Sequence, residues 1–355
     1  MNTIRKHLAA LLFVLPLLIC GCAANDIVHD SDEDGAANVV RFVLVKGTKG
    51  ELINTSGSDV VFSSKLSCFW VSAWNIPSTG SATVFIPDNT SDAGCVAGDA
   101  TNGYYQKVMY RTEDDKGVTY DTPFWTTVGS GTGSNPVDDE YLWKNGQTKS
   151  FLAYANLPAS GASVATASTG QTLTYTTVSS VADQKDILLG YYTGTAGTTS
   201  PATKGVALMR FKHALSAVEF AVGEIPEDEK ITGMTLSGLG KSGSVTMSTG
   251  GVFGSWTVAD FTQSLSQSAT DGFTPDSDTQ VIGEPFLLIP QVTETHNVTL
   301  TVNFLSGTSA SVTITEDTWD KGSHYIYTIN HQGGEDILLS MKLVDWDETE
   351  VPLDI

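Results

Sequence analysis

The segment Gly205-Val-Ala-Leu-Met-Arg-Phe-Lys-His-Ala-Leu-Ser-Ala-Val-Glu-Phe-Ala-Val222 carries two short apolar runs in close succession. Neither run, Gly205–Phe211 nor Ala217–Val222, reaches the length of an ordinary helix. Residues 213–218 could form one short turn, but no longer helix. A period of two over four to eight residues is typical of a β-strand. We therefore predict two strands joined by a turn at this position.

The same period of two extends from residue 38 to residue 344. No segment of ten or more residues carries the apolar stripe of a helix, and turn-forming clusters such as 129–136 and 161–170 separate the runs. Short strands that follow each other at spacings of about ten residues are typical of β-sandwiches. We therefore predict an all-β chain with strands at Val40–Val45, Val60–Phe62, Leu66–Ala73, Thr83–Ile86, Lys107–Arg111, Ser150–Tyr154, Ile231–Leu236, Val298–Phe304, Ser311–Thr315, Tyr325–Asn330 and Leu338–Val344.

The amino terminus has the features of an export signal. Arg5 and Lys6 precede an unbroken apolar run, residues 8–19, which is too short to span a bilayer. The run ends in Ile19-Cys-Gly-Cys22, which resembles the lipobox of bacterial lipoproteins. The resemblance implies a signal peptide over residues 1–21 and acylation of Cys22. The alternative is an ordinary secretory signal that is removed without lipid attachment.

Composition excludes several classes of protein. The chain has 19 basic and 40 acidic residues and a formal net charge of −21 at pH 7. A cationic face for nucleic acid or anionic lipid is therefore not expected, so we predict no nucleic-acid partner. With 41% hydrophobic and only 17% charged residues, the chain is also unlike a disordered acidic protein.

The acidic residues cluster early, and we interpret residues 22–37 as a solvated tether. A segment without large apolar residues, Thr193–Lys204, then separates two strand-rich halves. We predict an N-terminal β-sandwich over residues 38–200 and a C-terminal β-sandwich over residues 201–355. A weak internal echo agrees with this division, because Trp143-x-x-Gly146 and Trp319-x-x-Gly322 each lead into a strand with alternating aromatic residues.

Motifs for catalysis or metal binding are incomplete. The stretch 30–35 matches the first half of a calcium loop, but the twelfth position is Arg41 instead of glutamate. Residues 238–243 resemble the end of a phosphate-binding loop whose first glycine is missing. Cys68 and Cys95 either form one disulfide or stay as two buried thiols. We predict no enzymatic activity, no cofactor and no metal.

The tryptophans allow two interpretations. Trp70 and Trp74 are four residues apart, so on a strand both indoles lie on the same face. They are either part of the sandwich core or an exposed shelf on which sugar rings stack. Large aromatic residues dominate sandwich interiors, and this favours the core.

Several segments together resemble one family. In chain order they are Trp143–Ala155, Gln184–Leu189, Leu208–Val218, Ile231–Leu239, Phe286–Gln291 and Trp319–Tyr327. They resemble segments of the fimbrillin family, the lipoprotein subunits of type V pili in Bacteroides-type bacteria. The resemblance implies two tandem transthyretin-like β-sandwiches of Greek-key topology, without enzymatic activity or cofactor.

The resemblance also implies proteolytic processing. In the family a trypsin-like protease removes the N-terminal segment with the first strand, and a strand of a neighbouring subunit fills the groove. Here Val40, Phe42 and Leu44 would fill that groove before cleavage, and residues 337–344 or 351–355 would supply the incoming strand. Family cleavage follows an arginine in the loop after the first strand. This loop has lysines instead, so cleavage after Lys49, cleavage at Arg41, and no cleavage are all open.

The expected function is therefore a structural or accessory subunit of a surface fimbrium, assembled by donor-strand exchange with other pilus subunits. The precursor would be held in the outer membrane by the lipid on Cys22. The alternative is a monomeric or tip lipoprotein at the cell surface that acts as an adhesin for a glycan or a host protein.

Overall fold

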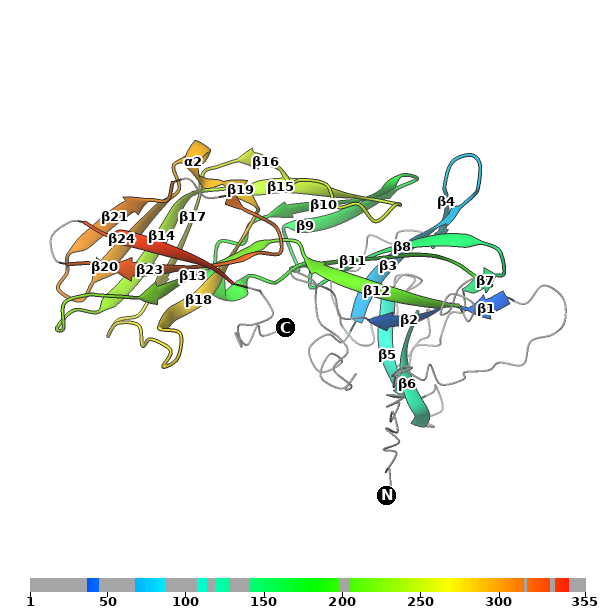
Figure 1. Ribbon diagram of the computed structural model, residues 1–355, viewed down its shortest axis with the longest axis horizontal. Coiled ribbons are helices and arrows are strands. Elements are labelled where there is room, and N and C mark those ends of the chain that lie inside the picture. Colours follow the sequence, from blue (N-terminus) through cyan, green and yellow to red (C-terminus); the bar gives the residue numbers. More distant parts are fainter. Residues whose placement is uncertain are drawn as a thin grey trace, which may run out of the picture. The chain divides into compact units, whose positions relative to one another are not determined.

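The computed structural model of the 355-residue chain describes residues 37–44, 68–86, 107–113, 119–127, 141–197, 205–315, 318–332 and 336–344. In this part of the chain, strands follow one another almost without interruption (Figure 1). Its helical turns are η1 (Val181–Asp183) and α2 (Thr293–His296). The predicted all-β class is confirmed. None of its helices is long and apolar enough to cross a bilayer.

The largest sheet closes on itself. Its strands follow the order β4-β3-β5-β6-β2-β12-β11-β8, and β3 also pairs with β8. The hydrogen bonding therefore runs around a ring, with β4 attached to the edge of β3. The strands are β2 (Arg41–Leu44), β3 (Cys68–Ile76), β4 (Thr83–Ile86), β5 (Lys107–Glu113), β6 (Thr119–Thr127), β8 (Thr148–Ala155), β11 (Leu188–Thr195) and β12 (Val206–His213).

A compact apolar core fills this ring. The short strand β1 (Ala37–Val39) pairs with β7 (Leu142–Lys144) beside it. Because side chains alternate across a strand, one face of each strand points into the ring. The buried residues there include Phe42, Phe69, Val71, Trp143, Phe151, Met209 and Phe211.

Two four-stranded sheets form a sandwich in the second half of the chain. One sheet has the order β18-β13-β23-β24 and the other β17-β14-β20-β21. Phe220, Leu236, Phe286, Val302 and Trp319 are buried in the core that they share. The strands are β13 (Ser216–Val222), β14 (Ile231–Leu239), β17 (Gln263–Ser268), β18 (Val281–Leu288), β20 (Thr299–Phe304), β21 (Ser309–Thr313), β23 (His324–Asn330) and β24 (Leu338–Val344), with β19 (Gln291–Val292) paired to β22 (Thr318–Trp319).

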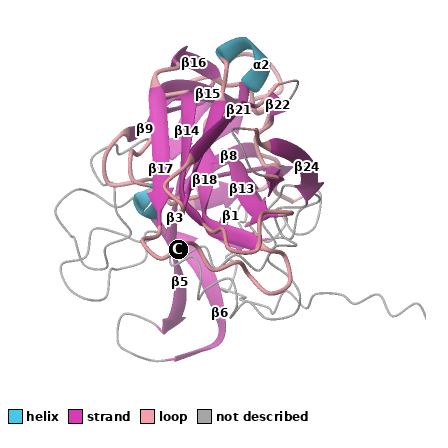
Figure 2. Cartoon of the chain, turned by 90° about the vertical axis from the view of Figure 1, so that its left-hand side faces the viewer, coloured by secondary structure: helices cyan, strands magenta, loops and turns pink. Residues whose placement is uncertain are grey.

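A further sheet combines strands from both halves of the chain. It has the order β16-β15-β10-β9, with β9 (Ala162–Ala167), β10 (Gly170–Thr176), β15 (Ser242–Ser248) and β16 (Thr257–Asp260). Its inner face contributes Leu173 and Val245 to an apolar cluster that also contains Trp70 and Trp74 of β3. Figure 2, with its strands in magenta, shows how completely sheets account for the described chain.

The expected boundary near residue 200 is crossed by hydrogen bonding. Strand β12 follows that position in sequence but pairs with β11 and β2, so it belongs to the closed sheet. Sheet membership changes after His213, at the turn Ala214–Leu215, where the opening segment passes from β12 to β13. The division into 38–200 and 201–355 therefore stays a prediction.

The expected turn cluster at 161–170 was wrong in part. Residues Ala162–Ala167 form β9, paired in register with β10. The strand was missed because its Ala, Ser and Thr residues are as common in turns as on an exposed sheet face. The strand expected at Val60–Phe62 and the turn expected at 129–136 lie outside the described residues.

Candidate functional site

The four-residue strand β2 completes the closed sheet. β2 lies between β12 and β6, parallel to β12 with the register Val206↔Arg41 to Met209↔Leu44. On its other edge it is antiparallel to β6, where Phe42 pairs with Trp125. Without β2, the edges of β6 and β12 would lack a hydrogen-bonded neighbour at this point.

The side chains of β2 alternate as the sequence predicts. Val40, at the start of this segment, is 0% exposed, Phe42 is 1% exposed and Leu44 is 2% exposed, whereas Val43 on the other face is 41% exposed. The inward side chains therefore occupy the core of the ring. Each is worth about 1.5–3 kcal/mol in burial, so together they contribute roughly 5–9 kcal/mol as an upper estimate.

Phe42 is the centre of this contact. Its ring centroid lies 5.7 Å from that of Phe69 on β3 and 5.8 Å from that of Phe151 on β8, both in edge-to-face geometry. Such pairs add about 0.5–1.5 kcal/mol each beyond the burial of area. Phe42 therefore joins β2 to β3 and β8, neither of which is its hydrogen-bonded neighbour.

Arg41, one of the two expected cleavage positions, lies inside this strand. Its backbone N–H donates to the carbonyl of Gly205 at 3.0 Å, and its Nη1 donates to the carbonyl of Val40 at 3.3 Å. A protease binds extended backbone whose hydrogen-bonding groups are free, so cleavage here first requires β2 to leave the sheet. Lys49, the other position, lies outside the described residues.

Two further expected sites are not described. Cys22 and Cys95 lie outside the described residues, and of Cys68 only the backbone at the start of β3 is described. The lipid attachment and the disulfide therefore stay predictions.

The apolar side chains of β24 are largely exposed, whereas those of β2 are buried. β24 is the edge strand of its sheet and pairs with β23 alone among the described strands. Leu338, Met341 and Leu343 are 65%, 43% and 47% exposed. Leu339, Met341 and Leu343 share one face of β24, with the same two-residue spacing as Val40, just before β2, and Phe42 and Leu44 on β2. An exposed apolar edge strand is poised to pair with another chain.

The tryptophan shelf is excluded. Trp70 is 5% exposed and stacks on Tyr154 with ring centroids 5.8 Å apart. Trp74 is fully buried, and its Nε1 donates to the carbonyl of Ala167 at 2.9 Å. The core interpretation is confirmed for both indoles, and neither can stack on a sugar.

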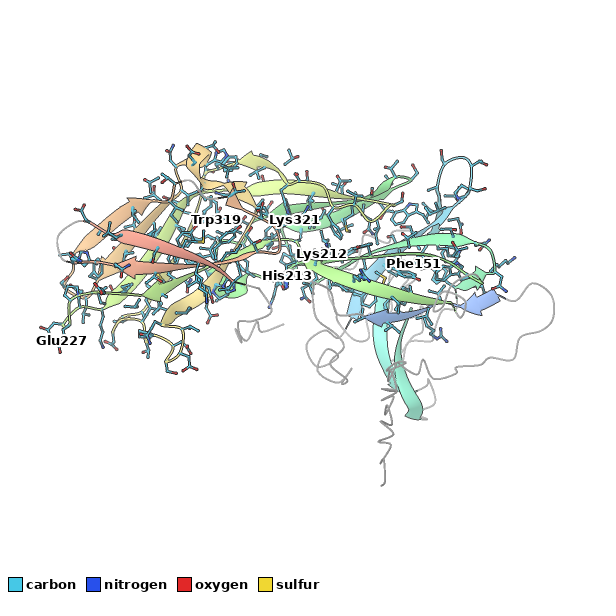
Figure 3. The ribbon with its side chains drawn as sticks, viewed as in Figure 1. Phe151, Lys212, His213, Glu227, Trp319 and Lys321 are labelled. Carbon is cyan, nitrogen blue, oxygen red and sulfur yellow. The ribbon has the colours of Figure 1, made fainter. Side chains whose placement is uncertain are left out.

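Buried polar contacts surround the turn between β12 and β13. Nδ1 of His213 lies 2.8 Å from Oδ2 of Asp186, and both side chains are buried. The hydroxyl of Ser216 donates to the carbonyl of Asp320 at 2.8 Å. The N–H of Gly322 donates to the carbonyl of Leu215 at 2.8 Å. Figure 3 labels His213 and its neighbour Lys212 at the end of β12.

Two glutamines extend this network. The side-chain oxygen of Gln184 accepts a hydrogen bond from the N–H of Leu287 at 2.8 Å, and that of Gln291 accepts one from Gly240 at 2.7 Å. Segments that carry the family resemblance therefore meet around one turn, although they are dispersed in the sequence. The sequence pattern did not predict this convergence.

The network is a poor candidate for catalysis. Asp186, His213 and Ser216 are the residue types of a nucleophilic triad, but Ser216 is 0% exposed and its hydroxyl already donates to Asp320. In a second buried pair, Nε2 of His324 lies 2.7 Å from Oε2 of Glu219. Across the described ranges, no group of three or more His, Cys, Asp or Glu side chains is arranged to hold a metal ion.

A family model described as fimbrillin-like matches residues 84–346. The chain therefore belongs to the fimbrillin-like family, and the resemblance noted in the sequence is confirmed. As a member, it is a fimbria-related protein of the cell surface. No curated protein sequence matches the chain significantly.

Several solved structures are similar to this chain. A protein from Bacteroides ovatus, proposed to act in cell adhesion, is 15% identical with a TM-score of 0.51 and covers 88% of this chain and 99% of its own. The tip fimbrial protein Mfa3 of Porphyromonas gingivalis is 9% identical, with a TM-score of 0.41 and coverages of 79% and 95%. The fimbrial anchor protein Mfa2 of the same organism is 10% identical, with a TM-score of 0.37 and coverages of 87% and 97%. Of these three structures, only the one from B. ovatus has a TM-score above 0.5, and it supports the fold.

Proposed function

We propose that this chain is a non-enzymatic subunit of a cell-surface fimbrium in which a strand from a neighbouring subunit replaces β2. The observation that carries the proposal is the position of β2. Its inward side chains are fully buried, yet the strand has no hairpin connection to either neighbour, because both are distant in sequence. Its removal would leave an apolar groove between β6 and β12 that favours capture of a new strand.

The groove sets requirements for the incoming strand. The strand has to run parallel to β12 to reproduce the main-chain bonds of β2, and it has to present apolar side chains at alternate positions. Its central side chain has to be large, because it fills the space between Phe69 and Phe151.

Strand β24 of a second subunit has the alternation of apolar side chains that the groove requires, and it would have to leave β23 to enter the groove. Leu339, Met341 and Leu343 would occupy the positions of Val40, Phe42 and Leu44, and Ser340 and Lys342 would face outward. Met is flexible enough to fill the space of a phenyl ring without a fixed shape. The partner in this proposal is another fimbrial subunit with such a strand, either a second copy or a relative.

Release of β2 would require proteolysis of the precursor. Because Arg41 is hydrogen-bonded inside β2, cleavage after Lys49 is the favoured route in this proposal. The same cut would separate the subunit from the lipid on Cys22, which would hold the precursor in the outer membrane until assembly.

Limited trypsin treatment of the full-length precursor tests the proposal. Wild-type protein should form SDS-resistant ladders after cleavage. Met341→Lys places a charge in the groove and should abolish the ladders, whereas Lys342→Ala, on the outward face of the same strand, should retain them. Ladders from Met341→Lys that match those of the wild type would rule out β24 as the incoming strand.

The alternative of a surface adhesin for a glycan or host protein no longer rests on Trp70 and Trp74, because both are buried. It would gain support if the mature protein kept acylated Cys22 and never formed ladders. The N-terminal residue of the protein on intact cells separates the two functions.

A further inference from the structure

Lys149 is a lysine in the interior of the closed sheet. It lies on β8 two residues before Phe151 and is 1% exposed. Its direct cross-strand partner is Asn75 on β3, and Nζ lies 2.6 Å from Oδ1 of that asparagine. Buried lysines are rare, and they are usually paired with a carboxylate.

The surroundings of Lys149 are apolar. Its Nζ lies 3.2 Å from the centroid of the Phe85 ring, and the described residues place no carboxylate within ion-pair distance of it. Burial lowers the pKa of the Lys149 amine to about 8. Roughly a tenth of the amine is therefore neutral at pH 7, and a neutral, desolvated lysine amine is a nucleophile.

We propose that Nζ of Lys149 forms an intramolecular isopeptide bond with Cγ of Asn75. The lone pair of Nζ attacks Cγ, the bond from Cγ to the amide nitrogen breaks, and ammonia leaves with one proton from Nζ. Oxidation states do not change, and no external reactant is consumed. Because Cγ is one carbonyl bond of about 1.23 Å from Oδ1, Nζ lies within about 3.8 Å of Cγ. That is close to the 3–3.5 Å separation of a near-attack arrangement.

A proton has to move from Nζ to the departing nitrogen, and the phenol of Tyr192, on the strand that flanks β8 on the side opposite β3, would take part in this transfer. The cross-strand partner of Lys149 on β11 is Gly194. A Cβ at Gly194 would lie 2.6 Å from the hydroxyl of Tyr192, so this hydroxyl occupies the side-chain space next to Lys149. Burial raises the pKa of the Tyr192 phenol, which keeps it protonated and able to relay a proton.

The bond would join neighbouring strands that do not depend on β2 for their pairing. β3 and β8 pair from Trp70↔Tyr154 to Ile76↔Thr148, and the cross-link lies near one end of this ladder. A covalent connection there would keep β3 and β8 together if β2 were removed and the ring opened. The inference does not require strand exchange, so either proposal can fail alone.

A tryptic digest of the denatured, reduced full-length protein tests the bond directly. Cleavage at Lys65, Lys107, Lys144 and Lys185 releases residues 66–107 and 145–185, with Lys149 as an internal site. The expected product is a branched peptide, 66–107 joined to 145–185, lighter than the sum of its parts by one ammonia. Finding residues 145–149 and 150–185 as separate peptides, with unmodified 66–107, would overturn the proposal.

Two variants test the reacting groups, and two more test the proton transfer. Asn75→Asp should give the same branched peptide with loss of one water instead of one ammonia, and Lys149→Arg should give none. Tyr192→Phe should slow formation of the branched peptide at least tenfold in a time course that starts from newly synthesised protein, because unfolding does not break a bond that has already formed. Tyr191→Phe, whose ring packs against Phe253, is the matched control and should leave the rate unchanged. An equal rate in both tyrosine variants would overturn the role of the Tyr192 phenol.

Discussion

Replacement of Phe42 by alanine tests whether β2 is part of the core of the closed sheet. Phe42 is 1% exposed and makes edge-to-face contacts with Phe69 and Phe151. Truncation of a buried phenylalanine costs about 3–5 kcal/mol, because burial is lost and a cavity remains. The two ring contacts place this site toward the upper part of that range, so we expect a loss of about 4 kcal/mol in the free energy of unfolding.

Equilibrium unfolding of the full-length chain in urea measures this loss. Intrinsic fluorescence is a suitable signal, because buried Trp143 lies 5.4 Å from Phe151 in the same core. Val43→Ala is the matched control on the same strand. Val43 is 41% exposed on the outward face, so its truncation should change the free energy of unfolding by less than about 0.5 kcal/mol.

Phe42→Ala should lower the free energy of unfolding strongly, whereas Val43→Ala at the next position should hardly change it. A loss below about 1 kcal/mol for Phe42→Ala would refute the reasoning, because such a value is typical of a surface site. Equal losses for the two variants would also refute it, since the alternation of β2 would then have no energetic consequence.

Three further predictions concern the remaining cores. Glu219→Leu leaves the buried imidazole of His324 without its carboxylate and should cost about 3–5 kcal/mol in thermal unfolding, and less when combined with His324→Leu. Burial lowers the pKa of Lys321 in the folded protein below its ordinary value of 10.5. Between the lowered pKa and 10.5, the unfolded chain therefore binds more protons than the folded protein. The free energy of unfolding should therefore rise with pH across this window, and Lys321→Met should flatten the rise in a pH series of urea titrations. Trp74→Phe leaves the carbonyl of Ala167 without its donor and should cost about 1–3 kcal/mol by urea unfolding.

The strands with large alternating apolar residues were predictable from the sequence. Val40, Phe42 and Leu44 alternate with less buried neighbours, and the structure buries those three. Some of the strands missing from the prediction carry few large residues. β17 (Gln263–Ser268), for example, buries Leu265 alone, so its period of two is barely visible among serines and glutamines. β11 and β18, in contrast, carry several large residues without a strict alternation.

The turns Trp143–Gly146 and Trp319–Gly322 show which features a local sequence pattern can predict. Gly146 and Gly322 both have positive φ, 79° and 69°, as the expected turns require. Trp143 and Trp319 are both fully buried. Their partners differ, because Trp143 donates to the nearby carbonyl of Gln147 whereas Trp319 donates to the hydroxyl of Tyr327. The sequence predicts the turn, and the tertiary contacts decide what the indole meets.

The convergence around the β12–β13 turn was beyond sequence reasoning for a different reason. His213 and Asp186 are 27 residues apart, and Gln184 and Leu287 are 103 apart. No local periodicity encodes such a pair, because each contact depends on how separate sheets are placed. The closure of the first sheet is a contact of the same kind, since β3 and β8 meet only when the ring is complete.

The topology of that ring explains why β2 in particular is suited to replacement. Among the described strands of the ring, β3–β4, β5–β6 and β11–β12 are consecutive antiparallel pairs, so excision of one member requires cuts on both of its sides. β2 instead pairs in parallel with β12, and parallel neighbours cannot be joined by a short hairpin. It also precedes every other strand of the ring, so one cut between Leu44 and Cys68 separates it from all of its neighbours. A cut after Lys49 falls in this interval. Relocation of the cleavable lysine within the interval should therefore preserve ladder formation, and ladders that require position 49 itself would contradict this topological account.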